Sequence, residues 1–341
     1  MNETTRAVLV GCGGISRTWL KSVAQIPEVE IVGLVDIAEQ AARERAAEFG
    51  LKIPTGDDLA KMLDRLRPDV VFNCTIPEAH LDVTLTALEH GCHVLGEKPL
   101  ADSMASARQM VAAAQQAGKI LAVIQNRRYN ARIRLLRHLV EREVIGPLTT
   151  VHCDFFLGAH FGGFRDHMPH VLLLDMAIHT FDAARFITGA DPVSVYCHEW
   201  NPAGSWYDRD ASAVAIFEMS NGLVYTYRGS WCAEGLNTSW ESDWRLIGSR
   251  GSLHWDGGDL LEGQAVAKTG AFLSELAPIT LPPYDPGAKV GAHAGVIGEF
   301  VRCVQQGGIP ETSAADNIKS LAMVFGAIAS AEMGKPAPIQ V

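Results

Sequence analysis

Two short groups of residues have types and spacings that suit chemistry. The first is Lys98, which stands between Glu97 and Pro99 at the end of the apolar run 93–95. A charge that ends a buried strand has to be paired or used, and ligands of open α/β sheets bind at the carboxyl ends of strands. We therefore expect this tripeptide to border a ligand site.

Asp175 and His179 form the second group. They stand at positions i and i+4 of the mostly apolar segment 172–182, so on a helix they share one face. A histidine near its ordinary pKa can accept a proton from a substrate hydroxyl, and a carboxylate one turn away can orient the histidine or bind a second hydroxyl. The alternative is a His–Asp pair that only satisfies itself in the core.

A glycine-rich turn predicts a nucleotide site. Gly11, Gly13 and Ser16 follow an apolar strand and open a helix, with a serine where a third glycine or alanine is usual. Such a turn brings backbone N–H groups, here including those of Gly14 and Ile15, close to a pyrophosphate at the helix N-terminus. The alternative is a glycine-rich turn that binds nothing.

The end of the second strand favours NAD over NADP. Asp36 stands where an acceptor for a ribose hydroxyl is expected. Its carboxylate would repel the 2′-phosphate of NADP, and Ile37 supplies no compensating cation. Arg43 and Arg45 lie farther along the next helix, at positions that we interpret as badly placed for that phosphate.

The elements that must position these residues alternate in the first third of the chain. Strands are predicted at 7–10, 30–36, 69–75, 93–98 and 119–124, with helices between them. One of these helices has Pro77 in its first turn and Gly91 just past its end. Repeated βα units with apolar strands predict a doubly wound parallel sheet, the Rossmann fold, in a cofactor-binding domain at 1–124.

From about residue 126 the pattern changes. Helices are predicted at 131–144, 172–187, 294–306 and 314–333, strands at 193–200, 212–219, 223–231 and 242–247, hairpin turns at 220–222 and 248–251, and a long loop at 278–287. This order predicts a second, α+β domain at 125–341 with a large, mostly antiparallel open sheet and helices on one side.

Composition narrows the class of protein. A chain of 341 residues suits two domains, and 48% hydrophobic with 20% charged residues is typical of a well-packed soluble protein. The net charge of −10 argues against nucleic acid or an anionic membrane as a partner. The seven cysteines form no C-x-x-C pair, and neither a signal peptide nor a membrane-length apolar stretch is visible. We expect a cytoplasmic protein with free thiols.

Taken together and in order, the motifs resemble the Gfo/Idh/MocA oxidoreductases, the family of glucose–fructose oxidoreductase and inositol 2-dehydrogenase. The resemblance spans nearly the whole chain and rests on five stretches: the turn at 11–16, Gly96-Glu97-Lys98-Pro99-Leu100, Asn126-Arg127-Arg128-Tyr129, Asp175-x-x-x-His179-x-x-Asp182, and 310–316 before an alanine-rich helix.

The resemblance implies hydride transfer between a nicotinamide cofactor and a secondary hydroxyl of a sugar, glycoside or cyclitol. It implies that Lys98 hydrogen-bonds the reacting hydroxyl, that His179 is the general base and that Asp175 binds or orients. Glu97 would help to fix Lys98 or the nicotinamide ribose, and the peptide before Pro99 is often cis in the family.

Further contacts follow from the same resemblance. Thr75, Pro77 and His80 match a segment that lines the cofactor, and Arg127 lies where the family borders the nicotinamide side. The family's open sheet commonly supports homodimers or homotetramers, and its final helices pack near the nucleotide domain.

The lead into the Asp/His helix departs from the family, which often has glycines there. Here it reads His167-Met168-Pro169-His170-Val171, in one loop with His160, Phe161, Phe164 and Arg165. We predict His160 and Arg165 as substrate contacts, and Trp206 as a ring that stacks on a sugar. His167-x-x-His170, with Asp166 or His160, also suits a metal, but we expect none because the hydride chemistry needs none.

Two other functions remain open. One is a cofactor- and sugar-binding regulator of the same fold without turnover, and the other an enzyme that uses transient NAD redox for hydrolysis or epimerisation. Because Lys98, Asp175 and His179 are all present, an NAD-dependent dehydrogenase is favoured.

Overall fold

The computed structural model describes residues 4–341 and divides into two compact units. The first comprises the chain up to Asn130 and then Gly287–Leu321, and the second comprises Ala131–Pro286 and Ala322–Val341. The sequence-based division assigned 125–341 to one domain whose final helices pack back toward the first. By contacts, residues 287–321 belong to the first unit, and the last junction falls inside a helix.

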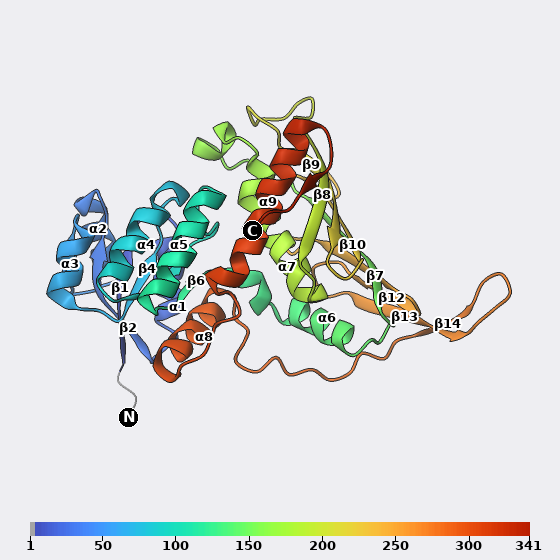
Figure 1. The fold of residues 1–341 in the computed structure, drawn as a ribbon, viewed down its shortest axis with the longest axis horizontal. Coiled ribbons are helices and arrows are strands. Elements are labelled where there is room, and N and C mark those ends of the chain that lie inside the picture. Colours follow the sequence, from blue (N-terminus) through green and yellow to red (C-terminus); the bar gives the residue numbers. More distant parts are fainter. Residues whose placement is uncertain (1–3) are drawn as a thin grey trace. The chain divides into compact units, whose positions relative to one another are not determined.

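Sheet A of the first unit is fully parallel (Figure 1). Its strands run in the order β3-β2-β1-β4-β5-β6, which is the doubly wound order with its reversal between β1 and β4. The strands are β1 (Thr5–Val10), β2 (Val29–Val35), β3 (Thr55–Gly56), β4 (Val70–Asn73), β5 (His93–Gly96) and β6 (Leu121–Val123). The predicted Rossmann architecture is confirmed.

Helices connect these strands: α1 (Ser16–Val23), α2 (Glu39–Glu48), α3 (Leu59–Leu66), α4 (His80–Glu89) and α5 (Met104–Ala117). Ser103 caps α5, since its Oγ accepts the Ser106 N–H at 3.1 Å, and Gly118 ends the helix with φ 63°. Trp19 of α1 is fully buried and packs on Phe72 of β4. Helix α3 and the short β3 were not predicted.

The returning segment 287–321 is bound to the rest of the first unit by a network of polar side chains. Tyr129 donates to Glu299 of α8 (His293–Gln306), and Lys289 pairs with the same carboxylate at 2.8 Å. Arg128 pairs with Asp316 at 2.7 Å. Arg128 and Tyr129 belong to the 3-10 turn η2 (Asn126–Tyr129), so the NRRY motif ties the segment 287–321 to this unit.

Sheet B of the second unit runs in the order β14-β13-β12-β11-β7-β10-β9-β8-β15. Its neighbours are antiparallel except for β7 and β10, which confirms a mostly antiparallel sheet. The strands are β7 (Leu148–Phe156), β8 (Pro192–Trp200), β9 (Ser212–Met219), β10 (Val224–Ser230), β11 (Asp243–Gly248), β12 (Gly251–Trp255), β13 (Leu261–Lys268), β14 (Glu275–Pro278) and β15 (Ala337–Pro338).

The two predicted hairpins, β9–β10 and β11–β12, are present. Strands β7, β13, β14 and β15 were not predicted, and β12 was implied only by the hairpin turn predicted before it. In β7, Val151, Cys153 and Phe155 are buried and alternate with His152 and Asp154, so the period-two signal was there to find. The predicted long loop matches the irregular chain between β14 and α8.

Helices cover one face of sheet B. The second unit contains α6 (Ala131–Glu141), α7 (Ile178–Thr188) and the C-terminal part of α9 (Ala314–Met333). Phe181 of α7 packs on Phe217 and Tyr227 at ring distances of 4.8 and 5.3 Å. The predicted helix 172–187 is confirmed, but its first part, Leu172–Ala177, is a wider π-helical turn.

Candidate active site

Lys98 follows β5, and its neighbour Glu97 points into the first unit. The Glu97 carboxylate is 7% exposed and accepts the Trp19 indole N–H at 2.6 Å and the Lys98 backbone N–H at 3.1 Å. His293 Nε2 lies 3.9 Å away. Burial by itself would raise the pKa of Glu97, but the His293 and Trp19 side chains outweigh it and the pKa is lowered. Glu97 therefore holds the Lys98 backbone as a buried anion.

The Lys98–Pro99 peptide is cis, as the resemblance implied. His80 supports the same loop, because its Nδ1 lies 3.0 Å from the Pro99 carbonyl oxygen and its Nε2 lies 3.1 Å from that of Thr75. His80 is buried. Its ring joins the loops after β4 and β5, whereas Thr75 and Pro77 are half-buried at the carboxyl end of β4.

The glycine-rich turn follows β1 at the topological switch point. Gly11 has φ 90°, and a Cβ there would meet the Cys74 carbonyl group and the Thr75 nitrogen within 2.8 Å, so only glycine fits. A Cβ on Gly13 or Gly14 would meet nothing within 4 Å. Within residues 4–341, no group accepts a hydrogen bond from the N–H of Gly13, Gly14 or Ile15. Open space beside exposed N–H donors fits a pyrophosphate.

Asp36 is pre-oriented at the end of β2. Its Oδ2 accepts the Cys12 N–H at 2.7 Å, and its Oδ1 accepts the Ala38 N–H at 2.9 Å. Each carboxylate oxygen can accept a second hydrogen bond, so the pair of oxygens remains suited to ribose hydroxyls. Ile37 is 97% exposed and brings no cation to this edge. Arg127 is half-buried in η2.

In the second unit, Asp175 is held by an arginine. Arg165 Nε lies 2.9 Å from Asp175 Oδ2, and a second guanidinium nitrogen lies 3.4 Å from Oδ1. The Asp175 side chain is 13% exposed. Asp175 belongs to the π-helical turn and His179 to α7, so the predicted i, i+4 pair spans a change of helix type. Arg165 thus fixes the carboxylate that was expected to orient His179.

The loop at residues 157–170, which the sequence predicts to face the substrate and which we call the substrate-side loop, is held by contacts between side chains. The Arg165 guanidinium lies 4.9 Å from the Phe161 ring centre and 4.8 Å from that of Phe164. His160 stacks on Trp206 at 3.7 Å and pairs with Glu234 at 3.0 Å. His160 therefore covers one face of the Trp206 ring.

The other two histidines of the loop have separate partners. His167 Nδ1 lies 2.5 Å from Asp208, and His170 Nδ1 lies 2.7 Å from the buried Glu199. The hydrogen bond with Glu199 raises the pKa of His170. In the described part of the chain, no cluster of three or more histidine, cysteine or acidic side chains suits a metal ion.

Comparisons with known proteins agree with this arrangement. The family described as "Oxidoreductase family, NAD-binding Rossmann fold" matches residues 5–125, and the "GFO/IDH/MocA C-terminal domain" matches residues 133–254. The chain belongs to the Gfo/Idh/MocA oxidoreductases. Its first domain is thus an NAD-binding Rossmann domain.

This Gfo/Idh/MocA protein is similar to sugar oxidoreductases over its whole length. It is 24% identical to 1,5-anhydro-D-fructose reductase of Ensifer adhaerens, over 97% of this chain and 98% of the relative. It is 25% identical to D-apiose dehydrogenase of Paraburkholderia graminis, over 97% and 88%. An oxidoreductase from Agrobacterium radiobacter, solved with NAD+, L-tartaric acid and magnesium, shares its fold with a TM-score of 0.85, at 20% identity and 98% coverage of both chains.

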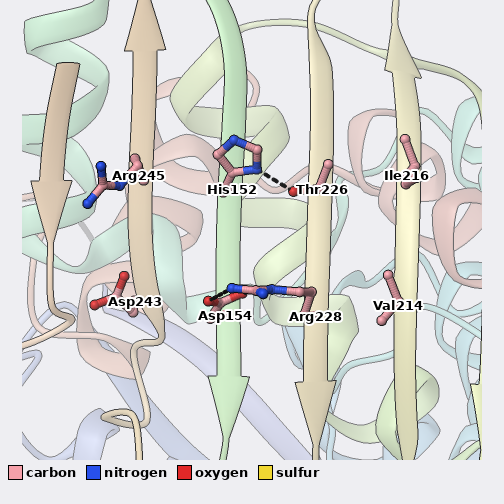
Figure 2. A pocket seen from close by; sticks show the side chains of 8 residues that line it. All are labelled: His152, Asp154, Val214, Ile216, Thr226, Arg228, Asp243 and Arg245. Carbon is pink, nitrogen blue, oxygen red and sulfur yellow. Dashed lines mark hydrogen bonds and ion pairs between the residues drawn. The ribbon is translucent and has the colours of Figure 1, made fainter.

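The face of sheet B opposite α7 carries a hollow of about 590 Å³. Its lining comes from the neighbouring strands β11, β7, β10 and β9. In Figure 2, Arg228 is paired to Asp154, and His152 is bonded to Thr226 at 2.6 Å. The full lining is His152, Asp154, Val214, Ile216, Thr226, Arg228, Asp243 and Arg245. No sequence-predicted site residue of this oxidoreductase lines the hollow.

Sequence reasoning missed three residues of the site in this Gfo/Idh/MocA chain. Trp19 and His293 contact Glu97, and Arg45 contacts the glycine-rich turn. A buried indole N–H needs an acceptor, so the position of Trp19 shortly after the glycine-rich turn weakly indicated a polar partner near the site. For His293 and Arg45 the chain offers no local pattern, since their partners lie far away in the sequence. In residues 4–341 no helix is both long and apolar enough to cross a membrane.

Proposed function

We propose that the protein is an NAD-dependent dehydrogenase that oxidises a secondary hydroxyl of a sugar, glycoside or cyclitol. One observation carries the proposal: Lys98 and the open glycine-rich turn stand at the same carboxyl edge of sheet A, after β5 and β1. These strands are separated only by β4, so the two features lie roughly 10 Å apart in the sheet direction. The sugar oxidoreductases among the relatives support the substrate class.

The chain's own residues would hold NAD at three places. The N–H groups of Gly13, Gly14 and Ile15 would bind the pyrophosphate, and Asp36 would bind the adenosine ribose. Thr75, Pro77 and Arg127 would border the rest of the dinucleotide. When bound, the nicotinamide supplies the acceptor for the hydride.

In the proposed mechanism, the Lys98 ammonium donates a hydrogen bond to the reacting hydroxyl and stabilises negative charge as it develops on the oxygen. Glu97 supports this by holding the Lys98 backbone. His179 accepts the hydroxyl proton as general base, and Asp175, fixed by Arg165, orients the base or binds a neighbouring hydroxyl. The substrate-side loop 157–170, with His160, Arg165 and Trp206, would contact the sugar.

A screen of NAD reduction against monosaccharides, glycosides, inositols and sugar acids tests the proposal. We expect NADH formation with a member of the panel and a stable carbonyl product. Binding of sugar and NAD without turnover would point to a regulator instead. Hydrolysed or epimerised product without net NADH would point to transient redox.

Cofactor choice has its own test. We propose that NAD is preferred because Asp36 is an oriented anion and Ile37 offers no cation to a 2′-phosphate. Asp36→Ala should lower the NAD-to-NADP ratio of kcat/KM. An equal or better kcat/KM with NADP in the wild-type protein would refute the preference.

We also propose a homodimer or homotetramer that assembles through the open face of sheet B. Tyr196, Trp200 and Ile216 are exposed apolar side chains of β8 and β9 that favour coverage. Sedimentation should show an oligomer for the wild type and a smaller species for Ile216→Asp. A monomeric wild-type protein would overturn the assembly.

For location we propose the cytoplasm. All seven cysteines are free thiols, which suits a reducing compartment. Burial raises the pKa of Cys12 to about 12 and that of Cys92 to about 11, so these thiols stay protonated and unreactive. Fractionation of cells that express the protein should recover it with cytoplasmic markers.

A further inference from the structure

We propose that Arg45 is a positioning residue for the cofactor, which holds the glycine-rich turn in the orientation that binds pyrophosphate. The inference rests on the proposed function, because it assumes that the turn binds a dinucleotide. By sequence alone, Arg45 is considered only as a partner of the 2′-phosphate of NADP and is interpreted as badly placed for that role. In the structure its guanidinium contacts the turn itself.

The contacts of Arg45 are specific to two consecutive carbonyl groups. One terminal guanidinium nitrogen lies 3.0 Å from the Cys12 oxygen and 3.0 Å from the Gly13 oxygen. The other terminal nitrogen bonds Glu48, which also accepts the Arg17 Nε at 2.7 Å. Arg45 thereby joins the turn to α1 and α2.

The planar peptide converts these contacts into an orientation of donors. In a trans peptide the C=O and the next N–H point in opposite directions. With the Cys12 and Gly13 carbonyls directed at Arg45, the N–H groups of Gly13 and Gly14 point away from it. Within residues 4–341, no group accepts a hydrogen bond from either N–H. A Cβ built on either glycine would meet nothing within 4 Å, so there is room for a ligand beside both donors.

Asp36 holds the same turn from its other side. The Asp36 carboxylate accepts the Cys12 N–H, and the Arg45 guanidinium donates to the Cys12 carbonyl. Both backbone groups of Cys12 are therefore held by charged side chains. The Arg45 charge also adds to the positive potential that a pyrophosphate meets at the start of α1.

Fold stability alone does not explain an arginine here. Arg45 is only 5% exposed, and its buried Nε has no acceptor among residues 4–341. Burying a guanidinium with an unsatisfied N–H costs free energy that a methionine of similar length would not cost. Arg43, two residues earlier, is exposed and, within residues 4–341, pairs only with Glu39, which makes it a matched control.

The experiment measures binding of NADH and of ADP-ribose to the wild type, Arg45→Met, Arg45→Lys and Arg43→Met. We expect Arg45→Met to lower the affinity for both ligands by about tenfold, the loss typical of a charged hydrogen-bonding group. Its melting temperature should stay within about 4 °C of that of the wild type. Arg45→Lys should fall between, since an ammonium lacks the planar fork. Arg43→Met should bind like the wild type.

The kinetic readout separates positioning from catalysis. The KM for NAD should rise in Arg45→Met. The kcat at saturating NAD and the KM for the sugar should stay within about twofold of the wild type, because Arg45 contacts neither the proposed catalytic residues nor the substrate-side loop. Wild-type affinity in Arg45→Met, or an equal loss in Arg43→Met, would overturn the inference alone. A wild-type protein that binds neither ligand would overturn the proposed function as well. If Arg45→Met does not fold, wild-type affinity in Arg45→Lys overturns the inference and a loss supports it.

Discussion

The glycine-rich turn and the substrate-side loop differ in the groups that they present to a ligand. The turn at Gly11–Ser16 presents backbone N–H groups between regular elements, and its geometry is held by Asp36 and Arg45. The loop 157–170 presents long side chains, and each of them is held by a partner from a different segment: Glu234 for His160, Asp175 for Arg165, Asp208 for His167 and Glu199 for His170.

The difference teaches where each kind of specificity resides. Backbone donors recognise a phosphate group whatever else the ligand carries, so the turn suits a cofactor common to many enzymes. Side-chain pairs can change one at a time without disturbing a strand or helix, so the loop suits a substrate particular to this protein. Variants on the two sides should therefore fail in different ways.

The largest effect is expected from Lys98→Met, which tests whether chemistry can be lost without loss of the turn. Turnover should fall by about 10³-fold because a preorganised charged donor to the reacting oxygen disappears. The dissociation constant for NADH, measured by fluorescence titration, should stay within about twofold of wild type. Lys61→Met, on an exposed lysine paired with Asp58, is the control. Wild-type turnover in Lys98→Met would remove Lys98 from the mechanism.

Gly13→Val should separate ligand binding from folding in the turn. The site beside Gly13 is open, so stability should barely change, while the new side chain occupies the space for the pyrophosphate and weakens NADH by about 10²-fold. In Gly11→Ala the stability should instead fall more than the affinity for NADH. The alanine would have to adopt φ 90° and its Cβ would meet backbone atoms within 2.8 Å, which strains the fold. Melting temperature and NADH titration check both variants. Equal behaviour of the two would contradict the distinction.

Arg165→Met tests the other side of the comparison. The variant removes the Arg165 guanidinium from the Asp175 carboxylate, so the KM for the sugar should rise by about tenfold while NADH binding is unchanged. Arg209→Met, on an exposed arginine of the same unit, should leave both constants unchanged. A change in NADH affinity without a change in the sugar KM would reverse the assignment of this loop.

The smallest effect is a pH dependence of stability from His170. Its pKa is raised by Glu199, so its contribution is fully present below the unfolded value of 6.5 and is lost as pH rises through the folded value. His170→Asn keeps a residue that tolerates the positive φ of 50°. Denaturant titrations should show a larger stability gap to wild type at about pH 6 than at about pH 9. Glu199→Gln should reduce that difference, while the longer pairing of His170 with Glu332 at 3.8 Å remains. A gap independent of pH would exclude the His170–Glu199 pair as its source.

The predictable part of this protein was local in the chain. Alternating apolar strands and helices identified sheet A, and turn residues identified the β9–β10 and β11–β12 hairpins. Strand β7 went unpredicted although its buried residues alternate with His152 and Asp154 at the period of two that marks a half-buried strand. The π-helical turn at Leu172–Ala177 was read as ordinary helix, since both have nearly the same apolar spacing.

By itself the sequence determined which groups are available for chemistry: the glycine turn with Asp36, the Glu97-Lys98-Pro99 tripeptide, and Asp175 with His179. Each of these groups comprises a few residues, and backbone periodicity places them at strand ends or on a helix face. Only the tertiary structure decided what holds these groups. Trp19 reaches Glu97 across 78 positions, and Arg45 reaches Cys12 across 33. Contacts between such distant residues depend on how elements pack, and no local spacing records them.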